Sequence, residues 1–128
     1  MSAKHAHIEG RWEDHKNRIS LRVPLIVFEE DKCQIVYCPP LDIYGYGTDE
    51  KEAFKSFNIC LGEFLQYSTN KGTLFNELGR LGWKVLKSKK KAIIPPSMSK
   101  LLSENENFSR IFDNFSFRKL EQEISIPA

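Results

Sequence analysis

The histidines come first in a search for chemistry, because imidazole serves as a general base and as a metal ligand at neutral pH. All three lie in the polar N-terminal stretch, at His5, His7 and His15. His5 and His7 could together hold zinc or copper, but no cysteine or carboxylate cluster with ligand spacing lies nearby. We therefore expect solvated histidines. The remaining sequence contains no histidine, so the folded part lacks the commonest general base.

The cysteines do not form a ligand or nucleophile set. Cys33 and Cys38 are five positions apart in an alternating segment, so they should point to opposite faces of one strand. Cys60 falls on the apolar stripe of a predicted helix. We expect Cys33 and Cys60 to be core residues, and the sequence indicates no basic neighbour that would activate a thiolate.

The carboxylates offer one candidate for metal-dependent chemistry. Asp42, at the start of a predicted strand, is the only candidate near a strand for such a site. Residues 29–31 fall in a turn, and residues 49–52 begin a helix, where acidic side chains cap the helix and interact with its dipole. Gly45-x-Gly47 is an incomplete phosphate-loop pattern. We predict no catalytic residue, no metal and no cofactor.

One segment is strongly basic. Residues 84–100 contain six lysines and no acidic side chain, although the net charge of the chain is only +2. The candidate nucleic-acid-binding residues are Lys84, Lys87, Lys89, Lys90 and Lys91. They would attract phosphates, with Tyr44 and Tyr46 as stacking groups. The alternative is a solvated hairpin tip whose lysines protect a sheet edge, with both tyrosines packed on the sheet.

Period-two hydrophobic patterns predict the strands. Residues 19–28 and 33–38 alternate on either side of a polar turn at 29–32, which predicts a β-hairpin. Residues 41–47 predict a short third strand, with glycines where no side chain fits or where the backbone needs special dihedral angles. Residues 124–126 alternate again and predict a terminal strand.

Helical spacing predicts one long helix and several short ones. The long helix of about five turns begins at Thr48 or Asp49 and ends near residues 68–70. Its apolar stripe consists of Ala53, Phe57, Cys60, Leu61, Phe64 and Leu65. A short helix at 73–82, a small hairpin from 83–87 and 92–94, and one or two helices within 97–113 complete the order.

This order predicts an α+β fold in which a small antiparallel sheet packs on one long helix, in two layers. We divide the chain into a polar tail at 1–17, an α+β domain at 18–94 and a mixed C-terminal extension at 95–128. The length of 128 residues, with 28% charged residues, fits one globular domain. No apolar run could span a membrane and no secretory signal is evident. We expect a cytoplasmic protein.

Three sequence blocks follow one another between residues 23 and 83. Val27–Glu30 ends a strand in acidic residues, Ile35–Asp42 is an aromatic strand leading into Pro-x-Leu, and Tyr46–Ala53 is a glycine followed by a Thr-headed helix with Glu-Ala. In this order and spacing the segment resembles the HicB family of type II antitoxins. The resemblance covers about half of the chain.

The resemblance implies a fold like a truncated ribonuclease H and a non-enzymatic protein that masks a small HicA-like ribonuclease toxin. Family members usually add a C-terminal DNA-binding module, but the order of elements after residue 87 matches neither a ribbon-helix-helix nor a helix-turn-helix, so DNA binding is left open. We expect a homo-oligomer. The predicted partner-interface residues are Tyr44, Tyr46, Ile124 and Ile126. The alternative function is a nucleic-acid-binding or regulatory module that uses residues 84–91.

Overall fold

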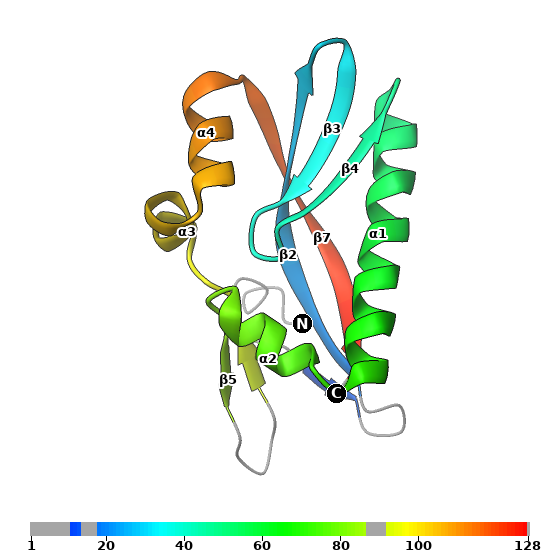
Figure 1. Ribbon diagram of the computed structural model, residues 1–128, viewed down its shortest axis with the longest axis vertical. Helices are drawn as coiled ribbons and strands as arrows, with labels where there is room; N and C mark the ends of the chain where they lie inside the picture. Colours follow the sequence, from blue (N-terminus) through cyan, green and yellow to red (C-terminus); the bar gives the residue numbers. More distant parts are fainter. Residues whose placement is uncertain (1–10, 14–17, 87–91, 128) are drawn as a thin grey trace.

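The structure, a computed structural model of the chain, describes residues 11–13, 18–86 and 92–127. Its elements form an α+β fold with a small antiparallel sheet and four helices (Figure 1). None of the helices within these ranges combines the length and the apolar character that a membrane crossing requires.

The sheet is built around its longest strand, β2 (Arg18–Glu30). One edge of β2 pairs with the C-terminal strand β7 (Phe117–Pro127). The other edge pairs with β1 (Arg11–Glu13) near its start and with β3 (Cys33–Cys38) near its end. β4 (Ile43–Gly47) then pairs with β3, and all of these pairings are antiparallel. The predicted β2–β3 hairpin is confirmed.

The turn between β2 and β3 is shorter than the sequence suggested. Only Asp31 and Lys32 lie in it, with φ of 53° and 64°, whereas Glu29 and Glu30 remain in the strand. A two-residue turn with positive φ at both positions matches the right-handed twist of the flanking strands. It therefore fixes the register of the hairpin.

The two glycines of β4 allow the long helix α1 (Glu50–Lys71) to approach the strand closely. A Cβ atom at Gly45 would lie 2.3 Å from the backbone nitrogen of Phe57, and one at Gly47 would lie 2.4 Å from Cβ of Glu52. Space for the helix, rather than backbone conformation, explains both glycines, because the positive φ in this region is at Asp42.

Helix α1 has the predicted start and the predicted buried stripe. The side chain of Asp49 accepts a hydrogen bond from the backbone N–H of Glu52 at 2.8 Å, and Glu52 in turn accepts one from the backbone N–H of Thr48. This reciprocal arrangement satisfies donors at the helix start. Gly72, with a φ of 70°, ends the helix. The buried positions of α1 are Ala53, Phe57, Leu61, Leu65 and Ser68.

A small unit joins the long helix to the C-terminal half. It contains α2 (Leu74–Arg80) and the two-stranded pair β5 (Lys84–Leu86) and β6 (Ala92–Ile94), as predicted. Trp83 anchors this unit, because its indole N–H donates to the carbonyl oxygen of Pro40 at 2.8 Å. The tryptophan thereby connects β5 to the turn between β3 and β4.

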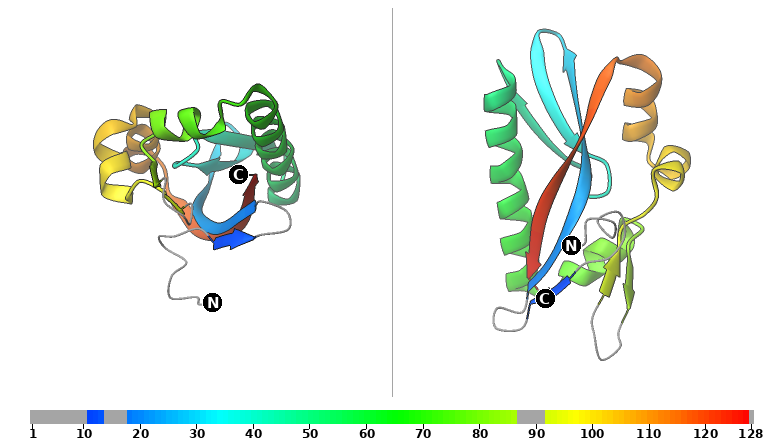
Figure 2. Two further views of the ribbon diagram at one scale, coloured as in Figure 1. Left: turned by 90° about the horizontal axis from the view of Figure 1, so that it is seen from below. Right: turned by 180° about the vertical axis from the view of Figure 1, so that it is seen from behind.

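The remaining helices correct the two-layer prediction. α3 (Met98–Glu104) and α4 (Glu106–Asn114) pack on the face of the sheet opposite α1, so the sheet lies between two helical layers at this end (Figure 2). β7 is also longer than the predicted terminal strand, and it pairs with β2 over eleven positions. The C-terminal extension therefore contributes β7 to the same sheet, and β1 belongs to it as well.

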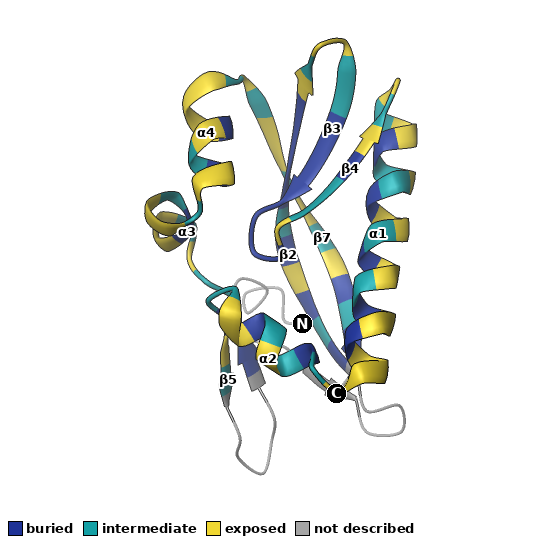
Figure 3. Cartoon of the chain, in the orientation of Figure 1, coloured by how far each residue is buried: buried dark blue, intermediate teal, exposed yellow. Residues whose placement is uncertain are grey.

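Each face of the sheet has its own apolar cluster. Figure 3 shows the buried positions of the strands and helices in dark blue. Alternate residues of β2 supply both clusters, because successive strand side chains point to opposite faces. The larger cluster lies on the α1 face and includes Val23, Leu25, Val36, Phe57, Leu61, Trp83, Ile124 and Ile126. The smaller cluster lies on the α3–α4 face and contains Ile26, Phe28, Ile35, Tyr37, Leu101, Phe108 and Ile111.

Candidate functional site

A stack of three tyrosines runs outward across the α3–α4 face of the sheet. Tyr37 on β3 lies opposite Tyr44 on β4, and their ring centroids are 4.3 Å apart. Tyr46 is two positions further along β4, so it points to the same face, and its ring is 5.8 Å from that of Tyr44 at an interplanar angle of 10°. Tyr37 is fully buried, whereas Tyr46 is 53% exposed. We call Tyr37, Tyr44 and Tyr46 the tyrosine stack.

The inner end of the tyrosine stack is held by hydrogen bonds. The hydroxyl of Tyr37 donates to Oδ1 of Asp42 at 2.5 Å and accepts from Nδ2 of Asn105 at 3.0 Å. Asn105 also caps α4, because its Oδ1 accepts from the backbone N–H of Phe108. Asn107 donates to the same oxygen of Asp42 at 3.3 Å. This network fastens the junction of α3 and α4 to the end of the sheet.

Burial makes the phenol of Tyr37 hard to ionise. Its pKa lies far above the ordinary value, first because it is desolvated and second because it hydrogen-bonds to the carboxylate of Asp42. A neutral phenol can donate to the carboxylate at every ordinary pH. The network is therefore a permanent structural support.

The outer end of the tyrosine stack meets a cation from α4. Nη1 of Arg110 lies 3.7 Å from Oε2 of Glu30, and its guanidinium lies 5.5 Å from the ring centroid of Phe115. Burial raises the pKa of Tyr44 and of Tyr46, and the positive charge of Arg110 opposes both rises. We call Tyr46, Arg110 and Glu30 the Tyr46–Arg110 surface.

A cavity of about 460 Å³ opens beside the inner end of the stack. Its apolar walls come from Pro39, Leu81, Pro96 and Leu101. Its charged and amide groups come from Asp42, Arg80, Lys100, Glu104, Asn105, Glu106 and Asn107. Such a volume can accept a small molecule or a side chain of a partner. The guanidinium of Arg80 is already paired with Glu77 at 2.8 Å, so the cavity keeps more acidic than basic groups free of ion pairs among its described lining residues.

The predicted interface residues divide into two pairs. Tyr44 and Tyr46 lie together on one face, packed on the sheet, and only Tyr46 is exposed. Ile124 and Ile126 are 4% and 0% exposed, in the cluster beneath α1. The structure places these two side chains in the core of their own chain, so they are not exposed for contact with a partner in this arrangement, and their role at an interface stays a prediction. They are buried because β7 pairs with β2 and turns them toward α1.

Lys84 is the one residue of the predicted basic cluster that the structure describes. It is exposed on β5. Lys87, Lys89, Lys90 and Lys91 lie outside the described residues, as do the three histidines.

The cysteine prediction needs a correction. The fully buried cysteine is Cys38, whereas Cys33 and Cys60 are only partly buried. Cys33 and Cys38 do face opposite sides, as predicted, and the α1 side is the more deeply covered one. Burial raises the pKa of the Cys38 thiol to about 12.

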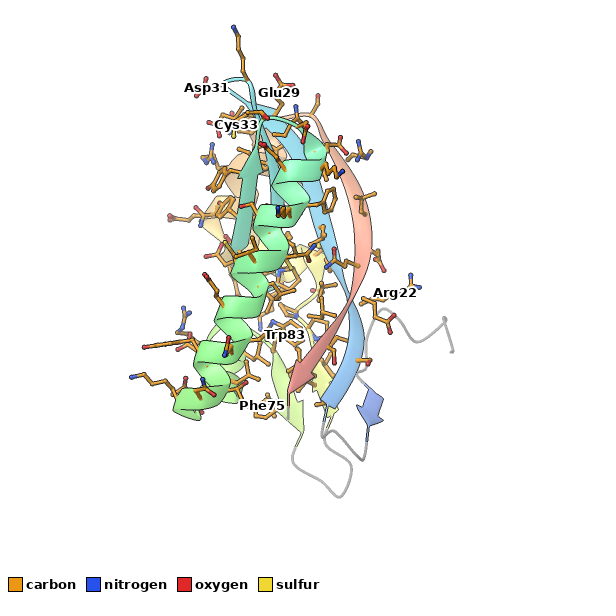
Figure 4. The ribbon with its side chains drawn as sticks, turned by 90° about the vertical axis from the view of Figure 1, so that its right-hand side faces the viewer. Arg22, Glu29, Asp31, Cys33, Phe75 and Trp83 are labelled. Atoms are coloured by element: carbon orange, nitrogen blue, oxygen red, sulfur yellow. The ribbon has the colours of Figure 1, made fainter. Side chains whose placement is uncertain are left out.

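The acidic residues at the β2–β3 turn do not converge with others. Figure 4 shows Glu29 and Asp31 at the tip of the hairpin, where Cys33 also lies. Within the described ranges, no three histidine, cysteine, aspartate or glutamate side chains come together as a metal site would need. Asp42, the one predicted candidate beside a strand, is occupied by Tyr37 and Asn107.

Sequence reasoning missed Arg110 and Asn105. Asn105 lies within the range 97–113, for which the sequence predicts one or two helices, and an asparagine before a helical pattern is a recognised N-cap signal. No local signal marks Arg110, because its partners Glu30 and Phe115 come from a strand and from the loop after α4.

With this geometry in view, the chain was compared with protein-family models, with curated proteins and with solved structures, and none of the three comparisons gave a match.

Proposed function

We propose that this protein acts by binding a protein partner, as a HicB-like antitoxin that masks a small HicA-like ribonuclease. The observation that carries the proposal is the Tyr46–Arg110 surface, an exposed tyrosine and an arginine supported by a rigid stack. Tyrosine and arginine are enriched among the residues that dominate binding energy at protein interfaces. We also propose that the chain has the truncated ribonuclease H-like fold of that family.

The order of elements supports the proposal. The three blocks of the family resemblance fall on the end of β2, on β3 with its following turn, and on the passage from β4 into α1. Tyr37 lies in the second of these blocks and Tyr46 in the third, and Tyr44 lies between the two. The resemblance and the exposed surface therefore concern the same part of the chain.

Charge supports a basic partner. On the Tyr46–Arg110 surface the charge of Glu30 is balanced by Arg110, and the acidic excess comes from Asp42, Glu104 and Glu106, which line the cavity. Complementary charge raises the association rate and selects partners more than it raises affinity. A ribonuclease that must hold RNA phosphates carries a basic surface, which suits this side of the molecule.

The test is co-expression with the small basic protein encoded by the neighbouring gene. Wild-type protein should co-purify with it and restore the growth that the toxin suppresses. Replacing Tyr46→Ala and Arg110→Ala together should abolish both effects. Tyr67→Ala is the matched control, because Tyr67 is a 64% exposed tyrosine on the outer surface of α1.

Two results would overturn the proposal. One is a wild-type protein that neither binds nor neutralises the neighbouring gene product. The other is equal loss of binding in the Tyr46→Ala, Arg110→Ala variant and in the Tyr67→Ala control. Circular dichroism spectra of all variants should match the wild type, which separates lost contacts from lost folding.

A further inference from the structure

Among the described strands, the C-terminal strand β7 pairs along one edge only, with β2. Its inner edge pairs with β2 from Phe28↔Phe117 to Arg18↔Pro127. No strand in the described part of the chain pairs with its other edge. An exposed strand edge is a template for pairing with another chain.

By contrast, helix α1 lies against the opposite edge of the sheet, which is formed by β4. On β4, the backbone N–H of Tyr46 donates to Oγ of Ser56 at 3.1 Å, and α1 lies against the glycines of the strand. The contacts of β7 with α1 come instead through side chains, Arg118 with Glu50 and Gln122 with Asn58.

The charges on β7 are arranged so that they suit a second copy of the same strand. Lys119, Glu121 and Glu123 are all exposed, and they share the face opposite Leu120. Because faces alternate along a strand, two antiparallel copies can slide only in steps that keep each face together. A register centred on Leu120 sets Lys119 of each copy opposite Glu121 of the other.

The neighbouring registers bring like charges together. One step in one direction places Glu121 opposite Glu121 of the second copy, although it also sets Lys119 of each copy opposite Glu123 of the other. One step in the other direction places Lys119 opposite Lys119. Of these three registers, the one centred on Leu120 brings opposite charges together without a like-charge contact. Like charges directly across a strand pair are destabilising, whereas opposite charges contribute favourably. The side chains of β7 therefore select the register centred on Leu120.

We propose that two copies of this chain associate through antiparallel β7 strands, with Leu120 next to the two-fold axis, to form one continuous sheet. Leu120 is partly buried against the main core, and in the dimer it gains its counterpart as an apolar neighbour. The surface is self-complementary, as a two-fold interface requires. This inference is independent of the proposed function, because the Tyr46–Arg110 surface belongs to β4 and α4.

Analytical ultracentrifugation of the full chain tests the proposal by charge reversal. The wild type should be a dimer, and Lys119→Glu or Glu121→Lys alone should weaken the dimer at least about tenfold. The double variant Lys119→Glu, Glu121→Lys should restore it, because the opposite pairs re-form. Glu63→Lys, the same charge change at an exposed position of α1, should leave it unaffected.

A cysteine scan checks the register. Leu120→Cys should form a disulfide-linked dimer on mild oxidation, because residues directly opposite each other have close Cβ atoms. Glu123→Cys should not, because its counterpart is displaced along the strand. A wild type that is monomeric at about 1 mM, a dimer indifferent to single charge reversal, or preferential cross-linking at residue 123 would each overturn the proposal.

Discussion

The face of the sheet under α1 and the face under α3 and α4 are held by different interactions. The α1 face is a continuous apolar cluster in which Phe57, Leu61 and Trp83 meet the sheet. The α3–α4 face has a smaller apolar cluster, and beside it the hydrogen bonds of Tyr37 with Asp42 and Asn105. Apolar packing gives stability and tolerates repacking, whereas buried hydrogen bonds demand fixed positions.

The difference explains where the candidate surface lies. Tyr46 and Arg110 belong to the face whose geometry is fixed by hydrogen bonds, so both are presented in a defined arrangement. The α1 face is the part that makes the fold stable. The predictions below separate these two roles, beginning with the change that should have the largest effect.

Phe57→Ala should lower the free energy of unfolding by about 3–5 kcal/mol, because it removes a fully buried aromatic ring from the α1 face. Phe108→Ala, also in a buried position, should act locally and release α3 and α4 while α1 stays folded. Urea unfolding measures the first effect and native-state hydrogen exchange the second. If hydrogen exchange were accelerated equally in α1 and in α4 in both variants, the two faces would not differ in this way.

Gly45→Ala should cost about 1–3 kcal/mol, because the added Cβ would lie 2.3 Å from the Phe57 backbone nitrogen and would push α1 away from β4. Gly62→Ala is the control, and its effect on stability should have the opposite sign. Nothing lies within 4 Å of that position, so better helix propensity should raise stability by about 1 kcal/mol. Thermal unfolding of both variants decides this, and a stable Gly45→Ala variant would contradict the close packing.

Tyr37→Phe should cost about 1–2 kcal/mol, because Asp42 and Asn105 lose their common partner. The pH dependence is a second readout. The pKa of Tyr37 is raised in the folded state, so its contribution is complete below the ordinary pKa of 10.0 and decreases as the pH rises above that value. The variant should show a weaker loss of stability in alkali, and an unchanged alkaline profile would contradict the network.

Glu50→Gln should have the smallest effect on stability, because Glu50 and Arg118 form an exposed ion pair outside both clusters. Arg118 lowers the pKa of Glu50. The contribution of the pair is therefore present above the ordinary pKa near 4.5 and is lost as the pH falls. Urea unfolding should show a small difference in the free energy of unfolding between the wild type and Glu50→Gln at low salt, and no difference at high salt. A large, salt-independent loss would mean that β7 depends on this pair.

Much of the fold could be predicted from local sequence patterns. Alternation predicted β2 and β3, and the Thr48–Asp49–Glu52 pattern predicted the start of α1. The sequence left two explanations for Gly45 and Gly47, lack of space or special backbone angles, and the structure shows the first. Each of these signals lies within a few residues of the feature that it specifies. The candidate site was predicted only in part, because Tyr44 and Tyr46 were found and Arg110 and Asn105 were not.

What the sequence determined by itself is the set of elements, their order, and which side of α1 faces the sheet. Tertiary structure decided that β7 pairs with β2 and thereby buries Ile124 and Ile126, and that α3 and α4 cover the second face. It also decided that Tyr37 meets Asn105, 68 positions away. The physical reason is that periodicity, capping and turns are local, whereas the choice of a strand edge or of a distant hydrogen-bond partner depends on which surfaces the assembled elements leave uncovered.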